Sequence, residues 1–143
     1  MTKRHVEVPP ETQAAVDETV AYVDERLSEG DTAAAVAAIL ADLFGDSEAY
    51  KRYQRGESVS PMTRMRLRSY DPRNALVETE HWAEQKLSAL QEAKCLRYLW
   101  SGFDLSPLSN NIAFALPFRQ TLANHLFAEA GDGLRLFGGI KIQ

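Results

Sequence analysis

Apolar side chains recur at helical spacing along the first third of the chain. The valines and the leucine of residues 16–27 follow one stripe, and Pro9-Pro10-Glu11 is typical of a helix start. Residues 36–44 repeat the pattern, with Asp31 placed as an N-cap and Gly45 as the left-handed residue past the end. The sequence therefore predicts two helices, which we expect to pair as an antiparallel hairpin.

Shorter apolar patterns, separated by glycine and proline, predict further helices. Ser60-Pro61 is a start signal and Asp71-Pro72 a stop signal, since the residue before proline avoids helical backbone. We expect Met62, Met65 and Leu67 to form an apolar face between them. The predicted helices span residues 46–55, 61–70, 78–100 and 115–130, with Gly102 and then Ser106-Pro107 ending the long one.

The last eleven residues follow a different pattern. Leu134–Phe137 and Ile140–Ile142 alternate apolar and polar side chains around Gly138-Gly139, which is typical of strands. A two-residue hairpin packed on the helices is one interpretation. An apolar edge strand invites pairing, so the other interpretation is that more strands follow in the intact protein. The predicted fold class is mainly α, a helical bundle that ends in a short β segment.

Composition narrows the classes of function. The 143 residues are 45% hydrophobic and 25% charged, as in ordinary globular domains. A formal net charge of −4 without a basic stripe argues against a nucleic-acid partner. No apolar run approaches the roughly 18 residues of a membrane span, there is no signal-peptide pattern, and Cys95 is the single cysteine. We expect a soluble cytoplasmic protein without a membrane partner.

Candidate catalytic and metal-binding side chains are few. His5, His81 and His125 share no metal-ligand spacing, so no metal site is predicted, and His125 is expected to be half-buried and structural. Cys95 is expected to be packed and unreactive, since Lys94 beside it lies on another side of the helix. The aromatic residues of the long helix are expected to fill the core rather than to line a groove. They are Trp82, Tyr98, Trp100 and Phe103.

A series of short motifs resembles a known family. The motifs are Ser69-Tyr70-Asp71-Pro72-Arg73-Asn74, Ala93–Leu99, Phe103-Asp104-Leu105-Ser106-Pro107, Phe118-Arg119, Leu126-Phe127 and the alternating Leu134–Gln143. Their order is similar to the N-terminal region of the maltose and galactoside O-acetyltransferases, which are hexapeptide-repeat enzymes. In that family a Tyr-Asp turn, a helix ending in an aromatic-Asn-x-Thr-x-Pro pattern and a helix ending in Leu-Phe precede the first coil. The likeness covers about residues 60–143.

The sequence departs from the family pattern in three places. Asp104 stands where asparagine is usual, and Gly138-Gly139-Ile140 stands where the family has a proline-aromatic pair. The arginine-rich stretch early in the family's long helix is missing at Leu87-Ser88-Ala89.

The resemblance implies a left-handed β-helix homotrimer that transfers an acetyl group from acetyl-CoA to a small-molecule hydroxyl acceptor. The general-base histidine and the coenzyme A sites of the family lie in coils that would follow Gln143. This chain alone is therefore expected to hold no catalytic residue, to bind no cofactor and to be inactive. Tyr70 and Asp71 match the family's acceptor-site turn, and a carboxylate accepts hydrogen bonds from hydroxyls. The other interpretation is that Asp71 only caps or ends a helix, as Asp-Pro often does.

This interpretation divides the chain into three parts. Residues 1–57 form an N-terminal helical extension, residues 58–131 the helical cap, and residues 132–143 the first β-helix strands. Helices that precede a solenoid cover its first coil. The alternative is a stand-alone helical protein-interaction module that uses the terminal strand or the face of Tyr50 and Tyr53. A helix-turn-helix regulator is a third reading, disfavoured by the lack of a basic recognition helix.

Overall fold

The computed structural model describes residues 8–75 and 87–127, and these ranges are helical with no strand. The elements are α1 (Pro10–Leu27), α2 (Thr32–Leu43), α3 (Ser47–Gln54), α4 (Pro61–Arg68), α5 (Pro72–Ala75), α6 (Leu87–Leu105), the 3₁₀ helix η2 (Pro107–Asn110) and α7 (Ile112–Leu126). The predicted mainly α class is confirmed for these residues, whereas the predicted β segment, 132–143, lies outside them. None of the described helices combines the length and apolar character needed to cross a membrane.

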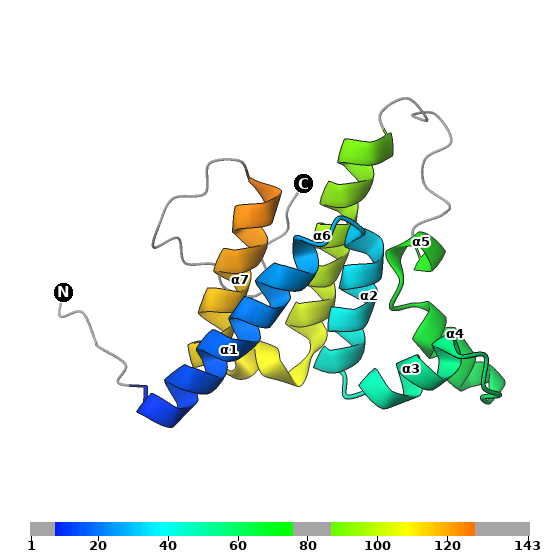
Figure 1. The fold of residues 1–143 in the computed structure, drawn as a ribbon, viewed down its shortest axis with the longest axis horizontal. Coiled ribbons are helices and arrows are strands. Elements are labelled where there is room, and N and C mark those ends of the chain that lie inside the picture. The colour runs from blue at the N-terminus through cyan, green and yellow to red at the C-terminus, as the bar shows by residue number, and fades with distance from the viewer. Residues whose placement is uncertain (1–7, 76–86, 128–143) are drawn as a thin grey trace.

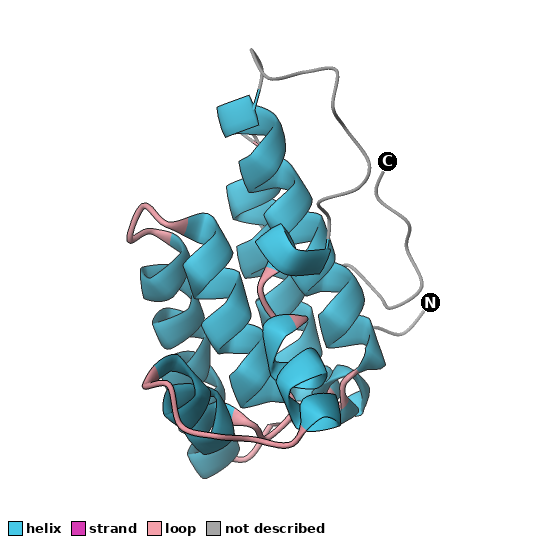
Figure 2. Cartoon of the chain, turned by 90° about the vertical axis from the view of Figure 1, so that its right-hand side faces the viewer, coloured by secondary structure: helices cyan, strands magenta, loops and turns pink. Residues whose placement is uncertain are grey.

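Four helices form the centre of the molecule (Figure 1). Each packs on two neighbours, in the cycle α1–α2, α2–α6, α6–α7 and α7–α1, and η2 makes the turn from α6 to α7. The pairing of α1 with α2 is therefore one contact within a larger bundle. α3, α4 and α5 lie to one side of α2, and Figure 2 shows the helices from that side. Residues from the predicted extension and from the predicted cap thus share one core.

The predicted apolar stripes of the first two helices fill this core. Val16, Val23 and Leu27 are at most 5% exposed, and Val36 and Ile39 at most 2%. They meet a second group from α6 and α7, which consists of Leu96, Leu99, Trp100, Phe103, Phe114, Phe118 and Leu122. The expectation that Trp100 and Phe103 belong to the core is confirmed, while Trp82 lies outside the described residues. The helices are stable because their apolar faces pack, since short isolated helices are marginal in water.

The predicted break at Gly102 is wrong. α6 continues through Gly102 to Leu105 and ends before Ser106-Pro107, the second predicted stop signal. The reason lies in α2, because a Cβ built on Gly102 would come 2.4 Å from Leu40 Cδ2. Gly102 is therefore a point where the long helix passes close to its neighbour.

Replacing Gly102 by alanine should destabilise the fold. Leu40 is 3% exposed, so its side chain has little room to move away from the new methyl group. Overpacking costs about 1–3 kcal/mol, which exceeds the gain in helix propensity of about 1 kcal/mol. We expect a net loss of roughly 1 kcal/mol in the free energy of unfolding, measured by urea titration. Ser101→Ala, on the exposed side of the same helix, is the control and should lose no stability.

The apolar face and the N-cap of α4 also differ from the prediction. Met62 and Met65 do not share a buried face with Leu67: they are 79% and 62% exposed, and Leu67 is fully buried. Residues 62 and 65 lie one turn apart, whereas 67 points to the other side. The Ser60 hydroxyl, at the N-cap position, donates to the Thr63 hydroxyl instead of accepting from backbone N–H.

The last described helix begins earlier than predicted. α7 starts at Ile112, where Asn111 caps it by accepting the Phe114 N–H at 3.3 Å. Pro117 lies inside the helix, although an interior proline costs about 3 kcal/mol. Phe127 follows the helix end and is 45% exposed.

Candidate functional site

The Tyr70-Asp71 turn connects α4 to α5. After α4 ends, the Asp71 N–H donates to the Arg68 carbonyl at 3.2 Å. Pro72 disfavours helical backbone at Asp71, the residue before it, so α4 does not continue through the turn. α5 therefore begins as a new helix at Pro72. The Asp71 Oδ1 accepts the backbone N–H of Arg73 at 2.9 Å, in the manner of an N-cap. The sequence signal Asp-Pro therefore marks a capped junction between two helices.

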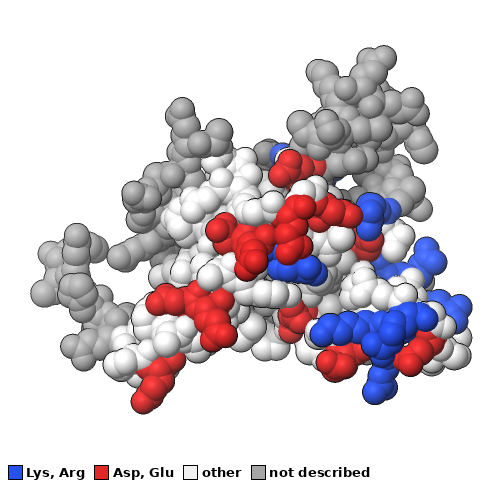
Figure 3. Space-filling view, in the orientation of Figure 1, with Lys and Arg blue, Asp and Glu red and all other residues white. Residues whose placement is uncertain are grey.

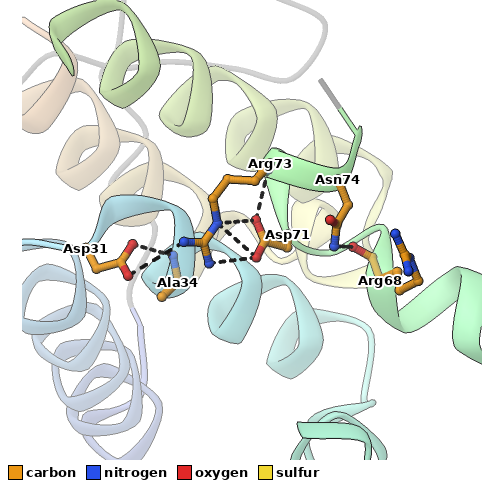
Figure 4. A network of polar contacts seen from close by, with 6 residues as sticks. All are labelled: Asp31, Ala34, Arg68, Asp71, Arg73 and Asn74. Carbon is orange, nitrogen blue, oxygen red and sulfur yellow. Dashed lines mark hydrogen bonds and ion pairs between the residues drawn. The ribbon is translucent and has the colours of Figure 1, made fainter. Parts of the chain in front are cut away.

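Arg73 holds the Asp71 carboxylate in a fixed orientation (Figure 4). Its Nε lies 3.0 Å from Asp71 Oδ1 and its Nη2 2.8 Å from Asp71 Oδ2, a bidentate pair. Its Nη1 also lies 3.9 Å from Oδ2 of Asp31, the residue that caps α2 through the Ala34 N–H. The Asp71 carboxylate is 15% exposed and the Arg73 side chain 60% exposed. One guanidinium thus joins the starts of α2 and α5.

Tyr70 belongs to a separate polar network. Its hydroxyl donates to Asp46, which also accepts from Arg66, with Nε at 2.8 Å and Nη2 at 3.3 Å. Burial and the Asp46 carboxylate together raise the pKa of Tyr70 to about 12. Burial opposes the charge of Asp46, but hydrogen bonds from Arg66 and Tyr70 keep the pKa of Asp46 below its ordinary value. Tyr70 therefore acts as a buried donor that ties α4 to the start of α3.

Aromatic side chains surround the turn. The Tyr50 ring lies 6.2 Å from the Tyr70 ring in an edge-on arrangement, and the Phe44 ring stacks on the other side at 6.0 Å. The Tyr98 hydroxyl donates to the Ser69 carbonyl. Burial and then the charge of Asp71 raise the pKa of both Tyr50 and Tyr98. The hydroxyl groups of Tyr50 and Tyr98 and the Asp71 carboxylate thus form a polar cluster near the turn.

The two predicted acceptor-binding residues thus lie together, but their polar groups point into different networks. The Tyr70 hydroxyl faces Asp46, and the Asp71 carboxylate faces Arg73. Asp71 does cap a helix, so that interpretation of Asp-Pro is confirmed. Its role towards a hydroxyl acceptor stays a prediction.

Sequence reasoning did not find the partners of these residues. Arg66 and Tyr70 meet Asp46 across 20 and 24 positions of chain, and no local pattern indicates such a pair. Arg73 carried a detectable signal, because an arginine directly after an Asp-Pro step can reach back to the capping carboxylate. The two bonds to Asp46 are structural in the first instance, since both connect the start of α3 with α4 and the turn after it.

The remaining candidates hold structural positions. Cys95 is buried, as predicted, and burial followed by the charge of Asp71 raises the pKa of its thiol. A protonated thiol is a poor nucleophile. His125 Nε2 lies 2.8 Å from Asp24 Oδ1 and joins α7 to α1 with its side chain 20% exposed, which confirms the half-buried structural role. His5 and His81 lie outside the described residues, within which no group of three or more His, Cys, Asp or Glu side chains is placed to hold a metal ion.

An ion pair is buried between α6 and α7. Arg119 Nη2 lies 2.8 Å from Asp104 Oδ1, and the Arg119 side chain is only 3% exposed. The guanidinium also lies 5.0 Å from the centroid of the Phe103 ring, in cation–π geometry. Asp104 is the position at which the chain departs from the asparagine of the family pattern, and in this fold its charge compensates Arg119.

Comparisons with known proteins give no family to which the chain belongs. No protein-family model, no curated protein and no solved structure matches it.

Proposed function

We propose that residues 58–131 are the helical cap of an acetyl-CoA-dependent O-acyltransferase of the hexapeptide-repeat type, with Tyr70 and Asp71 on the acceptor side. The observation that carries the proposal is the order of elements. A short helix ends at Arg68, the Tyr70-Asp71 turn follows, α6 ends just before Ser106-Pro107, and α7 ends at Leu126 with Phe127 after it. This order agrees with the motif series from which the resemblance was drawn.

The geometry at Asp71 supports an acceptor role. A carboxylate held by a bidentate arginine keeps one orientation, and each oxygen has more than one lone-pair direction. A hydroxyl group can therefore donate to Asp71 without displacing Arg73.

The intact protein would supply the remaining parts. The acetyl-CoA site and the general base would come from hexapeptide coils, and the active form would be a cytoplasmic homotrimer. The decisive test is the reading frame after the codon for Gln143, where we expect repeated [L/I/V]-G-x-x-x-x hexapeptides that include a histidine. A continuation without such repeats would contradict the proposal.

Two kinetic results are expected. The 143-residue chain mixed with acetyl-CoA and a galactoside should release no free coenzyme A thiol. In the protein with its coils, Asp71→Asn should raise the acceptor KM about tenfold, equivalent to one charge-assisted hydrogen bond, and leave the KM for acetyl-CoA unchanged. Asparagine keeps the N-cap, so the turn is preserved. Asp17→Asn, an exposed carboxylate of α1, is the matched control; an equal effect of both changes would refute a role for Asp71.

A stand-alone interaction module is the second candidate. Tyr50 is 8% exposed and packs on Tyr70, so the Tyr50 and Tyr53 face is turned inwards. The observation that favours this candidate is a different surface, the exposed Met62 and Met65 of α4.

A further inference from the structure

α4 presents two methionines between arginines. Met62 and Met65 lie one turn apart and are 79% and 62% exposed. At 100° per residue, Arg66 borders them on one side and Arg68 on the other, and Arg64 lies farther round the helix beyond Arg68. We call these five side chains the methionine–arginine face. A soft apolar pair bordered by guanidinium groups is suited to contact a partner that is apolar at its centre and acidic at its edge.

The surroundings of this face are also basic. α3 packs on α4, and residues 47–68 carry six basic and only two acidic side chains. Figure 3 shows these basic side chains gathered over α3 and α4, at the lower right. Two of the described ion pairs at this end, Lys51–Glu48 and Arg55–Glu57, are long and exposed, at 4.0 and 3.7 Å. A third pair, Arg66–Asp46, is short at 2.8 Å and offsets the charge of Arg66. The positive field offered to a partner therefore comes from Arg64 and Arg68 and from the weakly paired Lys51 and Arg55.

α1 carries the opposite pattern. Glu18, Tyr22 and Glu25 follow one another at spacings of four and three residues, so they form a stripe opposite the buried one, and Glu29 lies just past the helix end, where it pairs with Arg26 at 3.2 Å. Tyr22 is 42% exposed at the centre of this glutamate–tyrosine stripe, and its hydroxyl donates to Asp42 of α2 at 3.0 Å. Residues 11–31 hold seven acidic side chains and one basic one. Acidic side chains accordingly follow α1 from the lower left to the centre of Figure 3.

The two surfaces cannot meet within one copy. α1 and α4 lie on opposite sides of α2 (Figure 1). We propose that the methionine–arginine face of one copy binds the glutamate–tyrosine stripe of a second copy, head to tail. The charges are complementary, and the methionines would lie against the Tyr22 ring, a favourable sulfur–aromatic contact.

A second copy fits these observations better than a phosphate-bearing surface does. A membrane or a nucleic acid would use the basic end alone and would be repelled by the acidic stripe, whereas a second copy uses both. Because the two patches differ, the contact is heterologous and leaves one unused patch at each end of a dimer. The association should therefore grow with protein concentration into longer chains or a ring, and it should weaken with salt. This inference does not depend on the acyltransferase proposal.

Charge reversal on each patch tests the proposal by sedimentation velocity. Variant one is Arg64→Glu with Arg68→Glu, and variant two is Glu18→Arg with Glu25→Arg; all four side chains are exposed, so the fold is preserved. We expect the wild type to associate at about 50 mM salt and to associate at least about tenfold more weakly at 500 mM. Each variant alone should be monomeric under the low-salt condition.

A mixture of the two variants gives the most specific test of the proposed contact. Variant one carries two acidic patches and variant two carries two basic ones, so neither should pair with itself, whereas an equimolar mixture should associate again. A chain with all four reversals should associate again, because both patches have exchanged sign. A wild type that stays monomeric at low salt would overturn the proposal. So would association that either variant retains unchanged, or binding of monomeric wild type, but not of variant one, to phosphatidylserine vesicles.

Discussion

Replacing Phe103 by alanine is expected to lower the free energy of unfolding by about 4 kcal/mol. The ring is fully buried and stacks on Phe118 with the ring centroids 4.1 Å apart. It also meets Phe114 edge-on at 6.0 Å and lies under the Arg119 guanidinium. The truncation therefore removes buried apolar area, leaves a cavity and ends two aromatic contacts, each worth about 0.5–1.5 kcal/mol. Urea titration followed by far-ultraviolet circular dichroism measures the change.

Two companion variants make this result specific. Phe103→Leu keeps most of the volume and should lose no more than about 1.5 kcal/mol. Phe127→Ala removes a ring that is 45% exposed at the end of α7, and it should cost well under half as much as Phe103→Ala. A small effect of Phe103→Ala, similar to that of Phe127→Ala, would show that α6 and α7 do not pack as the structure has them.

The parts of the fold that the sequence predicts are those set by local physics. The stripe of α1 and the stripe of α2 are visible because one buried side of a helix repeats every 3.6 residues. The helix ends are visible at Gly30 and Gly45, since both adopt positive φ, 100° and 75°, which glycine tolerates at no steric cost. Asp31 caps α2 for an equally local reason, as its side chain reaches the Ala34 N–H three residues away.

The sequence-based prediction was wrong where contact with a neighbouring helix decides the environment of a residue. Gly102 resembles a stop signal, yet it continues α6 because Leu40 of α2 approaches too closely for a side chain. Met65 resembles a core residue, yet the one buried position of α4 is Leu67, and only the placement of α3 and α4 decides between them. A single helix of eight residues contains too few positions for its pattern to decide which side is buried.

The candidate site was predicted in part for the same reason. The turn at Tyr70 and Asp71 follows from the Asp-Pro step and the motif series, and it is where the sequence places it. The partners of the turn are not predictable, because Asp46 meets Tyr70 only after α3 and α4 have packed. Likewise Arg119 in the middle of an apolar helix gave no indication that it would be buried against Asp104.

Removing the charge of Asp104 is expected to be the most damaging polar change in the described residues. Asp104→Asn keeps the size of the side chain but removes the negative charge that lies 2.8 Å from the Arg119 guanidinium, which is 3% exposed. Breaking a buried ion pair on one side costs about 3–5 kcal/mol, and the 20% exposure of Asp104 places the expected loss near the lower limit, about 3 kcal/mol. The same urea titration measures it, and Asp17→Asn on the surface of α1 should change stability by no more than about 0.5 kcal/mol.

The double variant identifies the cause. If the loss arises because the buried Arg119 charge is compensated less well, Arg119→Met in the Asp104→Asn background should recover part of it, since the neutral pair has no charge to desolvate. Methionine also keeps a flexible apolar stem against the Phe103 ring, so the packing of α6 on α7 is retained. A double variant less stable than Asp104→Asn alone would show instead that Arg119 acts mainly through packing and other hydrogen bonds. In that case the contact of Arg119 with the Phe103 ring, and not its charge, would account for the difference between the two variants.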